Sequence, residues 1–137
     1  MDDLFDAIEC GIAAKRRGVV VVVTGGRDFT DGPFIFNSLD QFDLEIGIAA
    51  LYHGGANGVD NICGQWAWDW GVPCFVCSAN WKKYPKSAGP IRNHWMKDFS
   101  HAEYLLSFPG KRGTAHMTAA CEKIGMKIRK FTMETAP

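Results

Sequence analysis

Apolar positions along the chain form short continuous runs that alternate with segments of helical periodicity. The clearest run is the five consecutive valines at 19–23, which predicts a central strand buried on both faces. Four further apolar runs predict strands at 46–52, 72–77, 104–108 and 126–131.

The segments between these runs place apolar side chains three or four residues apart, as in amphipathic helices. They predict helices at about 33–43, 58–70, 90–99 and 114–124. The side chains expected to face inward are Ile35, Leu39, Phe42, Val59, Ile62, Cys63, Trp66, Trp70, Ile91, Trp95, Phe99, Met117, Cys121 and Ile124. Trp68 lies off this stripe, so we expect it at the surface or at an interface.

Helix-end signals agree with these ranges. Thr30 or Asp31 suits the N-cap of the first helix, and Pro90 suits the first position of the third. Gly125 is placed to end the fourth helix.

An additional amphipathic helix is predicted at residues 2–16, where Leu4, Phe5, Ile8 and Ile12 share one face. We therefore divide the chain into an N-terminal helix, residues 1–17, and a single domain, residues 18–137. The apolar face of this helix, together with the off-stripe Trp68, favours a homodimer or a larger homo-oligomer.

The alternation of strands and helices predicts an α/β, Rossmann-like three-layer fold. Its five-stranded sheet should be mainly parallel, with helices on both faces. In such sheets the ligand site lies beyond the carboxyl ends of the strands. The motifs TGGRD (24–28), HGGANG (53–58) and PGKRGT (109–114) each follow a predicted strand, so we expect them to line one crevice.

Glycine-rich turns that lead into helices are suited to binding anions, because backbone amides approach the ligand and the helix end is partly positive. Two such loops predict a site for phosphate, with arginine and lysine in support. The candidate ligand-binding residues are Gly25, Gly26, Arg27, Asp28, His53, Gly54, Gly55, Asn57, Gly58, Asp60, Trp81, Arg92, Asn93, Pro109, Gly110, Lys111, Arg112, Gly113 and Thr114. Neither GxGxxG nor GxxxxGK[ST] is present, so a conventional dinucleotide fold or P-loop does not follow.

Structural roles compete with binding roles at several of these positions. Asp28 fits a ribose hydroxyl or a brace within its own loop about equally well. Asp60 suits the amino end of a helix and, with Asn57, the shaping of its loop. Thr114 suits a helix cap. Trp81 suits stacking on a base or packing over the sheet edge.

Two histidines lie beside the glycine loops. His53 and His116 both suit acid–base chemistry, but loop bracing is the favoured interpretation for each. His94 and His101 have no partner in the sequence pattern.

Composition limits the possible functions. Lys plus Arg and Asp plus Glu both number 15, so the basic surplus typical of nucleic-acid binding proteins is absent. No apolar stretch resembles a signal peptide or a membrane span, so we expect a soluble, cytoplasmic protein. Cys74 and Cys77 have CxxC spacing, but no second such pair exists, so free thiols and no metal or other cofactor are expected.

The ordered motifs resemble those of the SLOG superfamily, which includes DprA/Smf and LOG-like proteins. They are TGGRDFTD, HGGANGVD, NWKKYPKSAGPIRN and FPGKRGTAHM, and the similarity runs from Val19 to Ile128. Its small YspA/YpsA-like branch is the most similar. The resemblance implies a Rossmann-like fold that binds nucleotides or their derivatives where these loops converge.

Members of the superfamily differ in activity, so the resemblance leaves alternatives. LOG proteins cleave the N-glycosidic bond of nucleoside monophosphates. The resemblance matches Arg92 to their catalytic arginine and places Met117 at their catalytic glutamate, which argues against hydrolysis here. Others sense NAD-derived or cyclic ADP-ribose signals, and DprA-like members bind single-stranded DNA. We therefore expect a sensor or sequestering protein for a small nucleotide-derived ligand, with LOG-like hydrolysis and DNA binding as alternatives.

Overall fold

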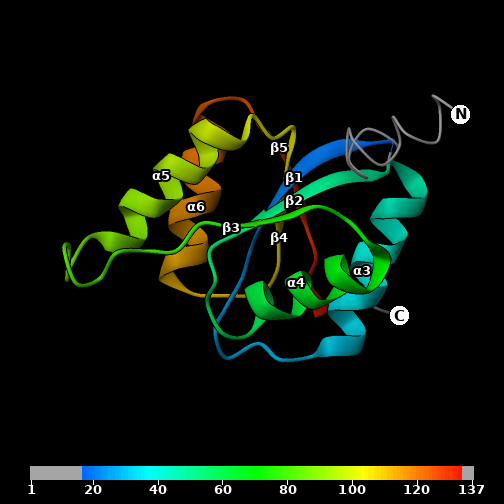
Figure 1. Ribbon diagram of the computed structural model, residues 1–137, viewed down its shortest axis with the longest axis horizontal. Coiled ribbons are helices and arrows are strands. Elements are labelled where there is room, and N and C mark those ends of the chain that lie inside the picture. The colour runs from blue at the N-terminus through cyan, green and yellow to red at the C-terminus, as the bar shows by residue number, and fades with distance from the viewer. Residues whose placement is uncertain (1–16, 134–137) are drawn as a thin grey trace, which may run out of the picture.

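A five-stranded parallel sheet organises the chain, as the computed structural model shows for residues 17–133 (Figure 1). Its strands, in the spatial order β3-β2-β1-β4-β5, are β1 (Val19–Thr24), β2 (Ile48–His53), β3 (Cys74–Val76), β4 (Tyr104–Ser107) and β5 (Lys127–Lys130). The helices are α3 (Gly32–Glu45), α4 (Val59–Trp70), α5 (Ala88–Ser100) and α6 (Arg112–Lys123). The predicted Rossmann-like α/β class is confirmed, whereas the predicted helix at 2–16 lies outside the described residues.

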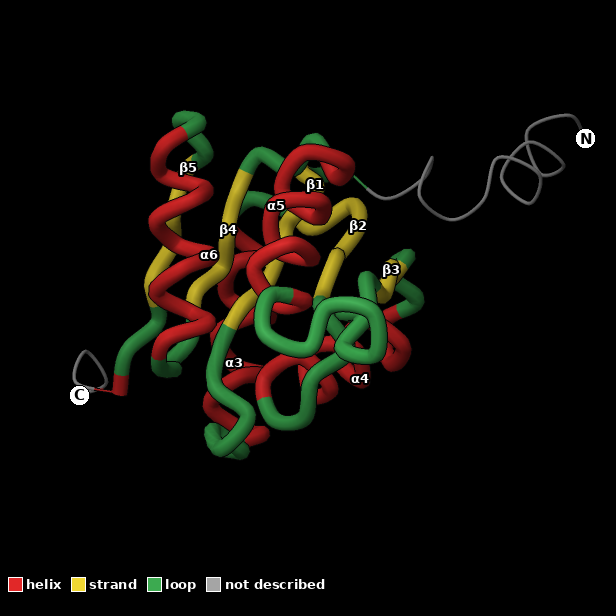
Figure 2. Tube along the Cα trace, turned by 90° about the vertical axis from the view of Figure 1, so that its left-hand side faces the viewer, coloured by secondary structure: helices red, strands yellow, loops and turns green. Residues whose placement is uncertain are grey.

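Strand β1 is central because its valines can be buried on both sides. Val21 and Val23 pack in the cluster with α3 and α4, while Val22 packs in the cluster with α5 and α6. β1 is hydrogen-bonded to β2 on one side and to β4 on the other. Figure 2 shows α5 and α6 in front of the sheet, with α3 and α4 away from them.

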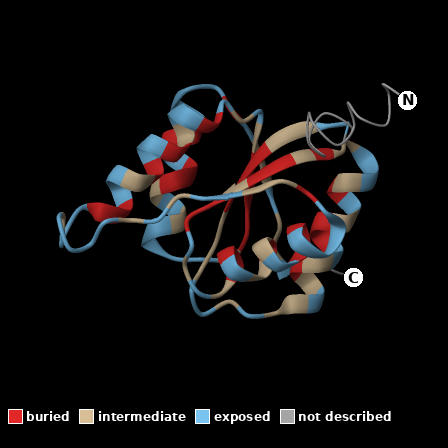
Figure 3. Ribbon diagram, in the orientation of Figure 1, coloured by how far each residue is buried: buried red, intermediate tan, exposed pale blue. Residues whose placement is uncertain are grey.

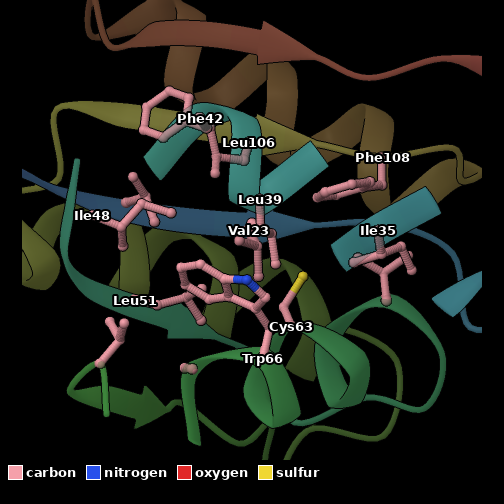
Figure 4. Packing of buried hydrophobic residues seen from close by; sticks show 14 residues of the cluster. Val23, Ile35, Leu39, Phe42, Ile48, Leu51, Cys63, Trp66, Leu106 and Phe108 are labelled. Carbon is pink, nitrogen blue, oxygen red and sulfur yellow. The ribbon is translucent and has the colours of Figure 1, made fainter. Parts of the chain in front are cut away.

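The larger core cluster lies between the sheet and helices α3 and α4 (Figure 4). Trp66 is fully buried there, and its indole Nε1 donates a hydrogen bond to Asp40 Oδ1 at 2.8 Å. Ile35, Leu39 and Phe42 extend from α3 toward the same region, as their spacing predicted.

The chain reverses its direction of travel across the sheet between β3 and β4. It first adds β2 and β3 on one side of β1, and α5 then returns it to β4 on the other side. The loops after β1 and β4 therefore diverge at neighbouring strand ends, which is where open α/β sheets place their ligands.

The predicted inward face of α5 is wrong. Ile91, Trp95 and Phe99 lie on the outside, and Trp95 stacks on Phe99 with ring centroids 4.5 Å apart. The inward positions belong to Asn93 and Met96 instead. The physical reason is that polar contacts of the helix's first turns, described below, fix its rotation about its axis.

Two other inward predictions are also wrong, and both lie at helix ends. Trp70 is the last residue of α4 and is 58% exposed, and Ile124 follows α6 and is 53% exposed. Trp68 is 81% exposed, which confirms that it lies off the buried stripe. Figure 3 shows the same division, with buried residues concentrated in the central strands and exposed residues on the outward helix faces.

Helix starts differ from the sequence-based ranges by one to two residues. Asp31 caps α3 as predicted, since its Oδ1 accepts a hydrogen bond from Phe34 N at 3.1 Å. Pro90 is the third residue of α5 rather than the first. Thr114 is the third residue of α6 and not its cap, because Lys111 occupies the N-cap position without a side-chain hydrogen bond.

The described residues contain no group of histidine, cysteine, aspartate or glutamate side chains placed to bind a metal ion. Cys63 and Cys121 are buried free thiols, and Cys74 and Cys77 are partly buried. Within residues 17–133, no helix has both the length and the apolar character that crossing a membrane requires.

The two tryptophans at 66 and 68 offer a matched test of the core. We expect Trp66→Ala to lower the free energy of unfolding by about 3–5 kcal/mol, because it opens a cavity and leaves Asp40 without its donor. Trp68→Ala should change it by less than about 0.5 kcal/mol. Urea unfolding measures both, and equal losses would contradict this packing.

Candidate functional site

The loops after β1 and β4 touch through their glycines. Gly26 N donates a hydrogen bond to Pro109 O at 2.8 Å. A Cβ on Gly26 would lie 3.1 Å from that oxygen and 3.2 Å from Gly110 Cα, so a larger residue would require the two loops to shift by a few tenths of an ångström. These glycines therefore allow one loop backbone to lie directly against another.

The loop after β2 also packs against Gly26. Val59 N donates to Gly26 O at 3.3 Å. Gly58 has a φ of +77°, and a Cβ there would collide with the carbonyl groups of Gly26 and Arg27. Three glycine-bearing loops are thus joined at the carboxyl edge of the sheet.

A crevice of about 780 Å³ opens beside these loops. It is lined by Thr24, Gly25, Gly26, Arg27, Asp28, Phe29, Ala56, Asp60, Trp81, Lys86, Gly89, Pro90, Arg92, Asn93, Pro109, Gly110, Lys111, Arg112, Gly113, Thr114 and His116. Most of the candidate residues named from the sequence are therefore brought together. The exceptions, which do not line the crevice, are His53, Gly54, Gly55, Asn57 and Gly58.

The HGGANG loop uses its amides internally. Asp60 Oδ2 accepts hydrogen bonds from Gly54 N at 3.1 Å and Ala56 N at 3.2 Å. His53 Nδ1 accepts one from Gly55 N at 2.9 Å. Bracing roles for Asp60 and His53 are therefore confirmed, and these three amides are not available to a phosphate.

Burial controls the ionisation of this bracing pair. It lowers the pKa of His53, and the charge of Arg92 acts in the same direction while that of Asp60 opposes it. Burial raises the pKa of Asp60, against the stabilising hydrogen bond from Ala56 N and the nearby positive groups. A neutral His53 is the form that accepts the hydrogen bond from Gly55.

Arg92 ties the HGGANG loop to α5. Its Nη1 donates to Gly54 O at 2.7 Å and to Cys77 O at 3.4 Å, and its Nε donates to Asn93 Oδ1 at 2.9 Å. Burial lowers the pKa of its guanidinium, partly offset by the charge of Asp60. Within the described residues Nη2 makes no hydrogen bond, so it is the part of the side chain that is free to contact a ligand.

The amino end of α6 is uncapped by any side chain and lines the crevice. Ala115 N donates to Lys111 O, but the amides of Arg112, Gly113 and Thr114 make no hydrogen bond within residues 17–133. First-turn amides and the helix dipole together favour a negative group. This is the strand–glycine–helix arrangement that the sequence predicted, whereas in the HGGANG loop the amides of Gly54, Gly55 and Ala56 are already bonded.

Charge is concentrated at the crevice. The cations in its lining are Arg27, Lys86, Arg92, Lys111 and Arg112. They face two carboxylates, Asp28 and Asp60, although the whole chain has equal numbers of basic and acidic residues. Asp28 Oδ2 lies 3.8 Å from Lys111 Nζ at the exposed rim, so it bridges two loops rather than bracing its own.

Trp81 forms one wall of the crevice. It lies in the long connection between β3 and α5, drawn in green in Figure 2. A Cβ on Gly89 would lie 3.3 Å from its ring, so the indole packs on the first turn of α5. Its exposed fraction of 46% leaves a ring surface on which a planar group can stack.

Two residues on α6 have surroundings that the sequence did not predict. Met117 is fully buried among Val22, Met96 and Leu105, so this position faces the core and not the crevice. His116, which was expected to brace a loop, lines the crevice. The signal that could have found it is its place four residues after Arg112 and three after Gly113, which puts it on the same helix face as these two crevice residues.

Comparisons with known proteins place the chain in a family. A family model described as the YspA, cpYpsA-related SLOG family matches residues 19–84, which include the loops after β1 and β2. The Gene 61 protein of Mycobacterium phage D29 is 31% identical over 119 residues, covering 81% of this chain and 94% of that protein. No solved structure gives a significant match.

The bracing role of His53 predicts that the folded protein loses stability on acidification. The unfolded chain binds a proton at His53 near the ordinary pKa of 6.5, whereas the folded chain resists it, so stability should fall as the pH drops below about 6.5. His53→Asn retains an acceptor for Gly55 N but cannot titrate, and it should flatten this part of the profile. Urea unfolding across the pH range gives the measurement.

The control for this experiment is His101→Asn. His101 is exposed and has a φ of +52°, which asparagine tolerates. Its profile should retain the wild-type fall. A profile for His53→Asn that overlays that of the control would contradict the role of His53.

Proposed function

The chain belongs to the YspA, cpYpsA-related SLOG family, and from this premise we propose that it binds a nucleotide or nucleotide derivative in the crevice. The ligand class is NAD- or ADP-ribose-like, or a nucleoside monophosphate, and the protein acts as a sensor or a sequestering protein. The observation behind this proposal is the uncapped first turn of α6 opening onto a crevice lined by five cations.

The phosphate is proposed to lie against the amides of Arg112, Gly113 and Thr114. Backbone amides at a helix start, with lysine and arginine nearby, are a common phosphate site. Lys111 and Arg112 are exposed, so their side chains have room to reach a bound anion. The free Nη2 of Arg92 supplies a further donor.

The base is proposed to stack on Trp81. Aromatic stacking gives affinity for any planar base, and it acts together with a charged phosphate site. Asp28, at the rim beside Lys111, is placed to accept a hydrogen bond from a ribose hydroxyl once the ligand replaces that ion pair. The crevice volume of about 780 Å³ lies in the range of small-molecule sites, about 300–1,000 Å³.

Binding without bond cleavage is favoured over LOG-like hydrolysis. Cleavage of an N-glycosidic bond needs a carboxylate near the cationic transition state. Met117 holds no charge and points into the core. Of the two carboxylates that line the crevice, Asp60 accepts two backbone hydrogen bonds and Asp28 lies at the exposed rim.

Calorimetry with AMP, ADP-ribose, NAD and cyclic ADP-ribose isomers tests the proposal. We expect at least one of them to bind. The double variant Lys111→Ala/Arg112→Ala should weaken that binding by about tenfold or more, because it removes charge-assisted contacts to phosphate. Lys123→Ala, at the other end of α6, is the matched control and should bind like the wild type.

The outcomes are distinct. Failure of every one of these nucleotides to bind the folded protein would overturn the proposed function. Equal affinities of the double variant and the Lys123→Ala control would move the phosphate away from α6.

Hydrolysis is tested separately. Incubation with AMP or ADP-ribose, followed by chromatography, should show no free base beyond a no-protein control. If the wild type releases free base, and Arg92→Ala still binds the ligand but releases none, the hydrolase alternative would be established instead.

A further inference from the structure

Three polar side chains from α5 and α6 form a chain of hydrogen bonds along one wall of the crevice. Arg92 Nε donates to Asn93 Oδ1 at 2.9 Å, and Asn93 Nδ2 lies 3.4 Å from His116 Nδ1. All three residues line the crevice, and Asn93 is only 6% exposed. This arrangement decides which atoms of His116 are left for a ligand.

The direction of the Asn93 amide follows from its neighbour. Arg92 is a donor only, so the amide atom that faces its Nε has to be the oxygen. The amide nitrogen is thereby directed at His116. Arg92 is itself held by Gly54 O and Cys77 O, so this orientation is fixed from the far side of the site.

The imidazole of His116 then has a defined tautomer. Because Asn93 Nδ2 is a donor, His116 Nδ1 acts as the acceptor, and the ring proton resides on Nε2. The His94 ring meets that of His116 edge to face, with centroids 5.3 Å apart and planes at 89°, which limits rotation of the ring. Nδ1 is occupied, so Nε2–H is the group available in the crevice.

We propose that His116 is a ligand-binding residue whose Nε2–H donates a hydrogen bond to an acceptor atom of the bound nucleotide. Asn93 is its positioning residue, and Arg92 in turn positions Asn93. This inference rests on the proposed function and adds to it a neutral, directional donor among the cations that line the crevice. A donor of fixed direction selects for the position of an acceptor, which a flexible lysine cannot do.

Nitrogen NMR of the histidine rings tests the tautomer without any ligand. In the wild type, His116 should give the ring shifts of an Nε2–H imidazole, with the signal assigned by its loss in His116→Gln. In Asn93→Asp, a carboxylate would accept from both Arg92 Nε and His116 Nδ1, so the His116 signals should change to those of a ring protonated at Nδ1. An Nδ1–H ring in the wild type would overturn the inference.

Calorimetry with AMP and ADP-ribose tests the binding role. His116→Ala should weaken binding of the better ligand by about tenfold, the loss expected for one good hydrogen bond. Asn93→Asp should weaken binding of the same ligand to a similar extent, although His116 is still present. Restoring asparagine at position 93 should recover the affinity. His101→Asn, an exposed histidine outside the crevice, should leave the affinity unchanged.

Failures of the two proposals are distinguishable. Absence of binding of every nucleotide to the wild type overturns the proposed function, and with it the ligand role of His116, even if the tautomer is as expected. Normal binding by both His116→Ala and Asn93→Asp, with their folds intact by circular dichroism, overturns the inference about His116 alone.

Discussion

The site depends on one backbone contact, the hydrogen bond from Gly26 N to Pro109 O. It joins the two loops that diverge at the switch point of the sheet, and Val59 N adds the third loop by donating to Gly26 O. A Cβ on Gly58 or Gly110 would collide with the backbone of Gly26, so these glycines are required by the packing of the loops on one another. The crevice exists because this contact holds its floor together.

Polar groups around the floor divide into two sets with different tasks. His53, Asp60 and Arg92 hold the HGGANG loop in shape from within, and their ionisation is set by burial. The exposed cations and the free amides of α6 face the opening. The exposed charges at the opening and the rigid frame are thus supplied by largely different residues, with Arg92 belonging to both.

The sequence was sufficient for the sheet, since a run of five β-branched valines favours a strand with both faces covered, and Val21, Val22 and Val23 are buried. It also located most of the crevice, because parallel strand ends bring distant loops together. The prediction of the inward face of α5 failed, because hydrogen bonds of Arg92 and Asn93 override the apolar stripe of Ile91, Trp95 and Phe99. The sequence also could not reveal that the amides of Gly54, Gly55 and Ala56 are already bonded within the HGGANG loop, because these bonds follow from three-dimensional contacts. The place of His116 on the crevice face of α6 could have been found from its spacing to Arg112.

The glycine contact between the β1 and β4 loops also limits how such a protein can diverge. A side chain at Gly58 or at Gly110 would collide with the backbone of the β1 loop at Gly26, and one at Gly110 would also collide with Thr114. Single substitutions at these two glycines should therefore disturb the floor of the crevice, whatever the ligand. New ligand preferences would arise in neighbouring segments that are free of this constraint, such as the exposed connection around Trp81 and Lys86, while the floor of the crevice stays the same.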